Sequence, residues 1–182
     1  MRFFTIGHGT RSLDDFLATL ASGPATQVVD VRSFPGSRRN PQFGRAALAT
    51  TLPAAGIAYH WLPALGGRRR SDPAASPNPA WREPAFRAYA DHTDSPEFAR
   101  GLDELLALAA QRPTAYLCAE RHPSSCHRRI LSDKLWSLGH EVIHLLDPGR
   151  VEAHEPPPFL RVDGAHLRYD LGTQAELPLL MK

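Results

Sequence analysis

The sequence contains few lysines, few cysteines and no long apolar run. No stretch approaches the roughly 18 consecutive apolar residues of a membrane span, so we expect no membrane partner. The first residues turn polar too soon for a secretory signal peptide, which predicts a cytoplasmic protein. Only Cys118 and Cys126 are present, too few for a disulfide framework, and in the cytoplasm both are expected to be reduced.

Lysine is much rarer than arginine: of the 21 lysine and arginine residues, 19 are arginine and only Lys134 and Lys182 are lysine. The planar guanidinium fork of arginine suits phosphate and carboxylate groups. Codon bias is the alternative explanation, because alanine and proline are also abundant. The net charge of +2 is unremarkable. The positions of the arginines are therefore better evidence than their number.

Apolar segments with strand and helix patterns alternate along the 182 residues, a length typical of one domain. Strands are expected at residues 3–7, 27–31, 57–62, 114–119 and 141–146. Such alternation predicts an α/β fold: a single-domain three-layer sandwich with a mostly parallel sheet of about five strands and helices on both faces.

Two segments depart from this alternation, and neither reads as a second domain, so residues 1–182 are predicted to form one domain. Residues 63–84 contain Gly-Gly, Arg-Arg-Arg and several prolines, which predicts a mobile excursion at the rim of a site. Residues 150–182 form a proline-rich tail in which Asp163-Gly164 indicates a C-terminal hairpin.

Most polar candidates follow directly after predicted strands. In parallel sheets, ligands bind outside the carboxyl ends of the strands. The residues at those ends, or in the loops and the helix that follow, are His8, Arg11, Asp30, Arg32, Arg38, Arg39, Asn40, Cys118, Glu120, Cys126, His127, Arg128 and Arg129. They are expected to gather at one edge of the sheet and to form one site.

The segment 114–139 is the centre of this prediction: an apolar run, a polar loop, and a helix expected from about 125 to 138. Cys126 would lie at the helix N-terminus, where the dipole and nearby cations lower a thiol pKa. We interpret Cys126, Glu120 and His8 as catalytic candidates. The substrate-binding candidates are Arg11, Asp30, Arg32, Arg38, Arg39, Asn40, His127, Arg128 and Arg129. The alternative for Cys126 is a half-buried structural cysteine that caps the helix.

Other interpretations of the cysteines stay open. Cys118 ends a strand, as the nucleophile of phosphatase loops does, but those loops need arginine six positions later and this chain has Ser124. A buried, inert Cys118 is the alternative. Cys118, Cys126 and His127 could also ligate a metal, although their spacing matches no common zinc pattern. The two cysteines could form a redox pair, but they lack C-x-x-C spacing. The sequence requires no cofactor.

Several stretches together resemble one family. TIGHGTRSLDDFL, VVDVRSFPGSRRNPQF, GIAYHWLPALGG, YLCAERHPSSCHRR and GHEVIHLL are similar, in order, to the signatures of the domain-of-unknown-function 488 family (DUF488). The resemblance implies this family's α/β fold and an enzyme-like set of polar motifs, and it names no reaction. Gly9 departs from the family pattern, which usually has serine there, and this removes a hydroxyl beside His8.

Three functions are compatible with these residues. The leading hypothesis is an enzyme acting on a small anionic substrate, phosphate-bearing or nucleotide-like. A non-catalytic nucleic-acid-binding module could use the same basic edge. A metal-dependent hydrolase is the third. The sequence does not indicate an oligomeric state.

Overall fold

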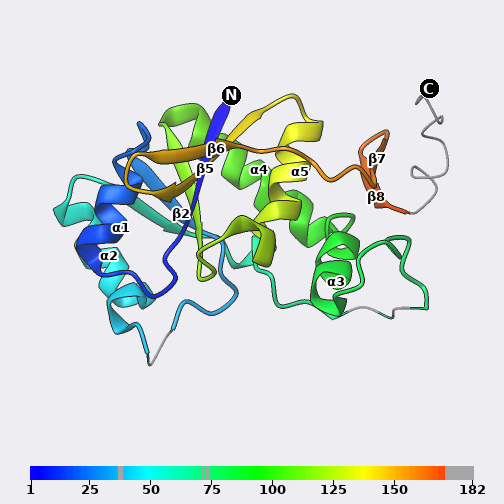
Figure 1. The fold of residues 1–182 in the computed structure, drawn as a ribbon, viewed down its shortest axis with the longest axis horizontal. Helices are drawn as coiled ribbons and strands as arrows, with labels where there is room; N and C mark the ends of the chain where they lie inside the picture. Colours follow the sequence, from blue (N-terminus) through cyan, green and yellow to red (C-terminus); the bar gives the residue numbers. More distant parts are fainter. Residues whose placement is uncertain (37–38, 71, 73, 171–182) are drawn as a thin grey trace, which may run out of the picture.

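The structure, a computed structural model, describes residues 1–36, 39–70, 72 and 74–170. A six-stranded sheet in the order β3-β2-β4-β1-β5-β6 forms its centre, and a separate two-stranded sheet pairs β7 with β8 (Figure 1). The strands are β1 (Arg2–Gly7), β2 (Gln27–Asp30), β3 (Ala58–Trp61), β4 (Thr114–Cys118), β5 (Glu141–Asp147), β6 (Arg150–Ala153), β7 (Leu160–Asp163) and β8 (His166–Tyr169). The α-helices are α1 (Leu13–Leu20), α2 (Arg45–Ala54), α3 (Pro84–His92), α4 (Pro96–Gln111) and α5 (Arg128–Ser137). Strands β1 to β5 are parallel, and β6 runs antiparallel to β5.

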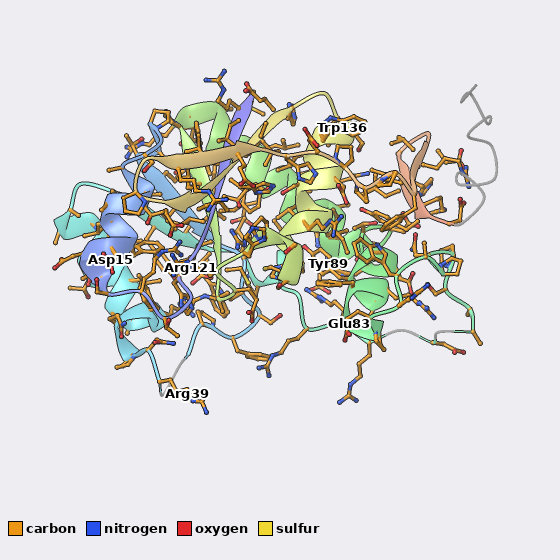
Figure 2. All side chains as sticks on the ribbon, viewed as in Figure 1. Asp15, Arg39, Glu83, Tyr89, Arg121 and Trp136 are labelled. Atoms are coloured by element: carbon orange, nitrogen blue, oxygen red, sulfur yellow. The ribbon has the colours of Figure 1, made fainter. Side chains whose placement is uncertain are left out.

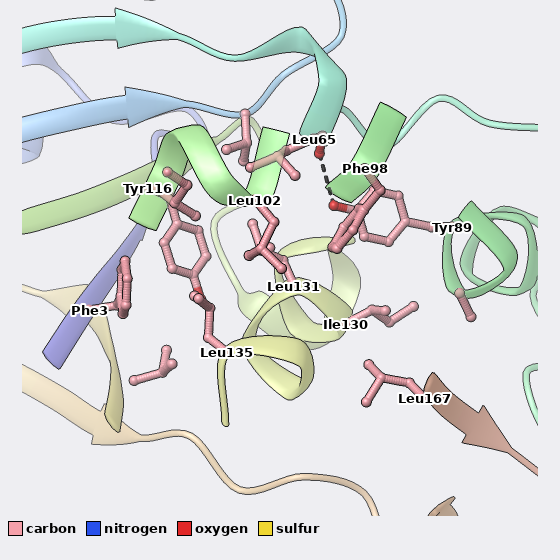
Figure 3. Close-up of a cluster of buried hydrophobic side chains, with 14 of the residues drawn as sticks. Phe3, Leu65, Tyr89, Phe98, Leu102, Tyr116, Ile130, Leu131, Leu135 and Leu167 are labelled. Carbon is pink, nitrogen blue, oxygen red and sulfur yellow. Dashed lines mark hydrogen bonds between the residues drawn. The ribbon is translucent and has the colours of Figure 1, made fainter. Parts of the chain in front are cut away.

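Two apolar clusters, one on each face of the sheet, make the protein a three-layer sandwich. Side chains of α1 and α2 pack with Phe4 and Ile6 of β1 on one face. Side chains of α3, α4 and α5 pack with Phe3 and Tyr116 on the other (Figure 3). Adjacent residues Phe3 and Phe4 enter opposite clusters because side chains alternate along a strand. The predicted fold class is confirmed.

Local signals explain why α1 and α4 begin where they do. The Ser12 hydroxyl accepts a hydrogen bond from the Asp15 amide at 3.1 Å, and Ser95 accepts one from Phe98 at 3.1 Å. Pro96 occupies the first helical position of α4, where its missing N–H costs nothing.

The structure differs from the sequence prediction at two places. The antiparallel strand β6 was not predicted, so the sheet has six strands rather than about five. Helix α5 begins at Arg128 rather than near 125, because a 3₁₀ turn at Pro123–Ser125 precedes it. The mobility predicted for residues 63–84 stays a prediction: in their described part Asn78 is fully buried and Trp81 contacts the ring of Tyr169, whereas Asp72, Ala74, Ala75, Pro77 and Pro79 are exposed.

The predicted hairpin is present as β7 and β8, with Gly164 at φ +59°, a conformation that glycine adopts readily. In the described parts of the chain, no helix is long and apolar enough to cross a membrane.

Candidate functional site

Three neighbouring strands bring the candidate residues together. Strand β4 lies between β2 and β1, so their carboxyl ends form one continuous edge. Backbone bonds hold this edge beyond the strands: the amides of His8 and Gly9 donate to the carbonyls of Cys118 (3.0 Å) and Ala119 (2.8 Å). The strand ends at which the candidate residues were predicted to gather therefore adjoin one another.

A cavity of about 600 Å³ opens at this edge, and we call it the strand-end pocket. Its walls come from the loops after β1, β2, β3 and β4 and from the start of α3. The lining residues that enter the argument below are His8, Arg32, Phe34, Arg39, Asn40, Gly67, Arg68, Phe86, Cys118, Glu120, Cys126 and His127. Most of the predicted site residues thus share one cavity.

Cys118, Cys126 and His127 form a compact group in the wall of the strand-end pocket. His127 Nδ1 lies 3.7 Å from the sulfur of Cys118 and 3.7 Å from the sulfur of Cys126. His127 Nε2 lies 3.1 Å from the carbonyl oxygen of Val31, which can only accept, so Nε2 carries a proton. In the neutral ring, Nδ1 is then the free base, and it faces both thiols.

The two thiols differ in acidity. Burial opposes ionisation of Cys126, but Cys118 and the positive charges of His127 and Arg128 outweigh it and lower the pKa of Cys126 well below that of an ordinary thiol. The neighbouring Cys126 and burial raise the pKa of Cys118. The pair therefore favours one thiolate, on Cys126, beside one protonated thiol.

The same three side chains could hold a metal ion. Their ligand atoms all lie within 4.8 Å of one another. Zinc bonds sulfur at about 2.3 Å and nitrogen at about 2.0 Å, so one ion could contact all three after small side-chain movements. The bond from His127 Nε2 to a backbone carbonyl also orients the ring as ligating histidines usually are. Among the described residues, no other group of three His, Cys, Asp or Glu side chains converges in this way.

His8 and Arg32 form a rigid wall of the pocket. Arg32 donates to both carboxylate oxygens of Asp30, at 2.8 and 2.5 Å, and to the Phe43 carbonyl at 2.9 Å. Its Nη1 lies 3.1 Å from His8 Nε2, and arginine can only donate, so His8 carries its proton on Nδ1 and donates to the Gly9 carbonyl at 2.8 Å. Burial, with the charge of Arg32, lowers the pKa of His8 to about 4. His8 is therefore neutral at pH 7, with both nitrogens engaged.

Arg11 and Arg128 lie behind the pocket walls, not in them. Arg11 donates to the carbonyls of Gly7 and Leu146 and to Asp147. Arg128 is 1% exposed and donates to Thr5 and to the loop carbonyls of Glu120 and Arg121. Both were predicted to bind substrate; in this structure both donate to backbone carbonyls around the site, and neither lines the pocket.

The remaining candidates lie at the rim, in a second cavity or outside the described residues. Arg39 is exposed and projects from the loop after β2 (Figure 2). Arg129 packs over the Trp81 ring at 5.3 Å and lines a separate cavity of about 450 Å³ that also contains His144 and His154. Arg38 lies outside the described residues. Glu120 and Asn40 line the strand-end pocket, and the Glu120 side chain is exposed.

Sequence reasoning did not select Gly67 and Phe34, which line the pocket. A Cβ at Gly67 would lie 2.4 Å from His127 Nδ1, so this glycine lets the chain pass close to the imidazole. Phe34 is 72% exposed at the pocket, with the Arg68 guanidinium 5.8 Å from its ring centroid. The Gly66-Gly67 pair was the available signal for a close backbone approach.

The sequence matches the family described as "Domain of unknown function DUF488" over residues 12–135, more than half of the chain. The chain belongs to the DUF488 family. No curated protein and no solved structure matches it. In this DUF488 protein the matched region contains Arg32, Glu120, Cys126 and His127, whereas His8 precedes it.

Proposed function

We propose that this DUF488 protein is an enzyme that acts on an anionic, phosphate-bearing or nucleotide-like substrate in the strand-end pocket. The observation that carries the proposal is one cavity with a thiol–imidazole group in its wall and cationic side chains at its rim. Arg39 and Arg68 are exposed there, so their guanidinium groups are accessible to a phosphate or carboxylate.

The geometry supports covalent catalysis by Cys126. His127 Nδ1 accepts the thiol proton, and the sulfur attacks the electrophilic atom of the substrate while the bond to the leaving group breaks. The leaving group takes that proton from His127. Water then cleaves the thioester or thiophosphate bond, with the Glu120 carboxylate as the base that accepts the water proton. His8 is less suited to this step because Arg32 occupies its acceptor nitrogen.

Phe34 supports the nucleotide-like part of the proposal. Phe34 is 72% exposed at the pocket, so its ring is accessible to a ligand. Its ring offers a stacking surface, and the cation beside it suits a ligand that joins an aromatic ring to a phosphate.

Thermal-shift titration with nucleoside mono-, di- and triphosphates and inorganic phosphate tests the proposal. At least one should raise the melting temperature, and Arg68→Ala should weaken its binding about tenfold by removing a charge-assisted contact. Arg70→Ala is the matched control, since Arg70 is exposed nearby and does not line the pocket. Cys126→Ser should abolish labelling by an electrophilic phosphate analogue. Unchanged ligand responses in both Cys126→Ser and Arg68→Ala would remove the proposal.

A metal-dependent hydrolase is the second candidate, favoured by the convergence of Cys118, Cys126 and His127. A bound zinc would lower the pKa of a coordinated water and supply the nucleophile in place of Cys126. Elemental analysis of protein purified without chelators should then find about one metal per chain, lost in His127→Ala. If the protein is purified without metal and binds no added zinc, the metal-dependent hydrolase is excluded.

Nucleic-acid binding stays a prediction, as does the cytoplasmic location. Binding to DNA or RNA should fall steeply with salt if phosphates contact the arginines. A gel-shift series from low to physiological salt measures this, and no binding at low salt would exclude it.

A further inference from the structure

A continuous chain of hydrogen bonds runs from the pocket loop through the protein interior. It joins six side chains in the order Arg128, Thr5, His144, His154, Asp133 and Tyr169. The successive distances are 2.9, 3.0, 3.1, 2.8 and 2.6 Å. All six side chains are buried, and none of the steps proposed above uses the four in the middle. We call this set the buried relay.

The ends of the relay determine the proton positions inside it. Ionised Asp133 can only accept, so Tyr169 and His154 Nε2 both donate to it. Neutral His154 then accepts at Nδ1, which requires a proton on His144 Nε2. The remaining His144 nitrogen, Nδ1, must accept from the Thr5 hydroxyl.

Thr5 in turn accepts from Arg128, which can only donate. Every donor in the relay therefore has one acceptor, and only one arrangement of protons satisfies all five bonds when both rings are neutral. Burial is the main cause that lowers the pKa of His144 to about 3, which keeps that ring neutral.

The relay ends on the loop that forms one wall of the strand-end pocket. Arg128 Nη1 binds Thr5, while Nη2 donates to the carbonyls of Glu120 (2.7 Å) and Arg121 (3.2 Å). The loop has little space in which to shift toward β1, because a Cβ at Gly7 would lie 1.8 Å from the Glu120 carbonyl oxygen. The Arg128 side chain therefore holds the start of this loop, at Glu120 and Arg121, against β1.

We propose that Thr5, His144, His154 and Asp133 are positioning residues for the strand-end pocket, acting through Arg128 on the loop that carries Glu120 and Cys126. They touch neither the pocket nor its proposed ligand. Their role in catalysis rests on the proposed function. Their effect on the position of the loop does not depend on it.

Hydrogen–deuterium exchange of single-residue variants tests the relay. Thr5→Val removes the hydroxyl and keeps the side-chain shape, so Arg128 and His144 each lose a partner. Amides of residues 119–127 should then exchange roughly tenfold faster, because local opening becomes easier. Thr5→Ser keeps a hydroxyl and should restore slow exchange.

Thr19→Val is the matched control. Thr19 is also fully buried, but its hydroxyl donates to the Asp15 carbonyl within α1. This variant should change exchange in α1 and leave residues 119–127 as in the wild type. The proposal would be overturned if the amides of residues 119–127 exchanged at the same rate in Thr5→Val and in Thr19→Val. So would fast exchange that Thr5→Ser does not reverse, because packing rather than the hydroxyl would then be the cause.

Nitrogen-15 spectra of the histidine rings give an independent readout. At a pH at which both rings are neutral, His144 and His154 should each carry their proton on Nε2. A proton on Nδ1 of either ring would overturn the relay. Neither experiment needs a substrate. If no nucleotide or phosphate binds, the proposed function is removed but the positioning role of the relay is not. If the exchange and nitrogen-15 results contradict the relay, the proposal that the pocket binds an anionic substrate is not affected.

Discussion

The donors of Arg32 are committed to Asp30, Phe43 and His8 before any ligand arrives. Its place at the end of β2 could be predicted, because the apolar run before it marks a strand. Its partners could not, because Phe43 and His8 come from other segments whose approach depends on the fold. The partners of Arg11 and Arg128 could not be predicted for the same reason, and the sequence suggested ligand binding only because both residues are arginines.

Two buried histidines predict how stability depends on pH. Burial is the main cause that lowers the pKa of His8 to about 4 and of His144 to about 3, against an ordinary 6.5. Above pH 6.5 both rings are neutral in the folded and unfolded chains. As the pH falls below 6.5, the unfolded chain binds protons that the folded chain excludes. Folding should therefore weaken by about 2 kcal/mol per histidine near pH 5.

Urea unfolding at a series of pH values measures this loss. His8→Asn should remove part of the slope between pH 6.5 and 4. His60→Asn is the control, because His60 is only partly buried. An unaltered slope in His8→Asn would contradict the assignment of the acid sensitivity to His8.

At the scale of single elements, the start of α5 shows what sequence patterns leave undecided. The apolar spacing predicted the helix, but the 3₁₀ turn at Pro123–Ser125 shortens it by about a turn and places Cys126 ahead of it. Helix ends are set by such local hydrogen bonds, which periodicity does not report. Cys126 therefore lies in the loop but contacts the start of α5: the Arg128 amide donates to its sulfur at 3.5 Å and the Arg129 amide to its carbonyl oxygen at 3.0 Å.

The segment after β3 provides a test at this scale. Gly67→Ala places a methyl group within 2.4 Å of His127 Nδ1, so the imidazole or the backbone must move. The expected cost is about 1–3 kcal/mol, as for other overpacked sites. Chemical denaturation compares this variant with Gly36→Ala, where an added Cβ meets nothing within 4 Å. Equal stability of the two variants would show that His127 moves freely.

For the whole molecule, the alternation of strands and helices predicted the three layers and the shared edge, and both are present. The antiparallel strand β6 was missed because Arg150–Ala153 is short and exposed at all four positions. The contact of Trp81 with the C-terminal hairpin was missed because no local pattern links residues so far apart.

The hairpin should contribute to the stability of the whole domain. Leu167 and Tyr169 of β8 are buried in the larger apolar cluster, and Tyr169 binds Asp133. A chain that ends at residue 158 should lose about 3–6 kcal/mol relative to one that ends at residue 170. Calorimetry should show a melting temperature lower by roughly 10 °C. Equal melting temperatures would mean that β7 and β8 are dispensable.

The central position of β1 constrains the order in which the protein can fold during synthesis. Phe3 pairs with Thr114 and Arg2 with Glu141, so the strand made first waits for partners made more than a hundred residues later. Such distant pairings close large loops and slow folding. A nascent chain that stops before β5 exposes one edge of β1 and lacks His144. We therefore expect ribosome-bound fragments shorter than about 140 residues to depend on chaperones. The two thiols of the site should stay accessible to solvent, and so to thiol reagents, until β5 emerges.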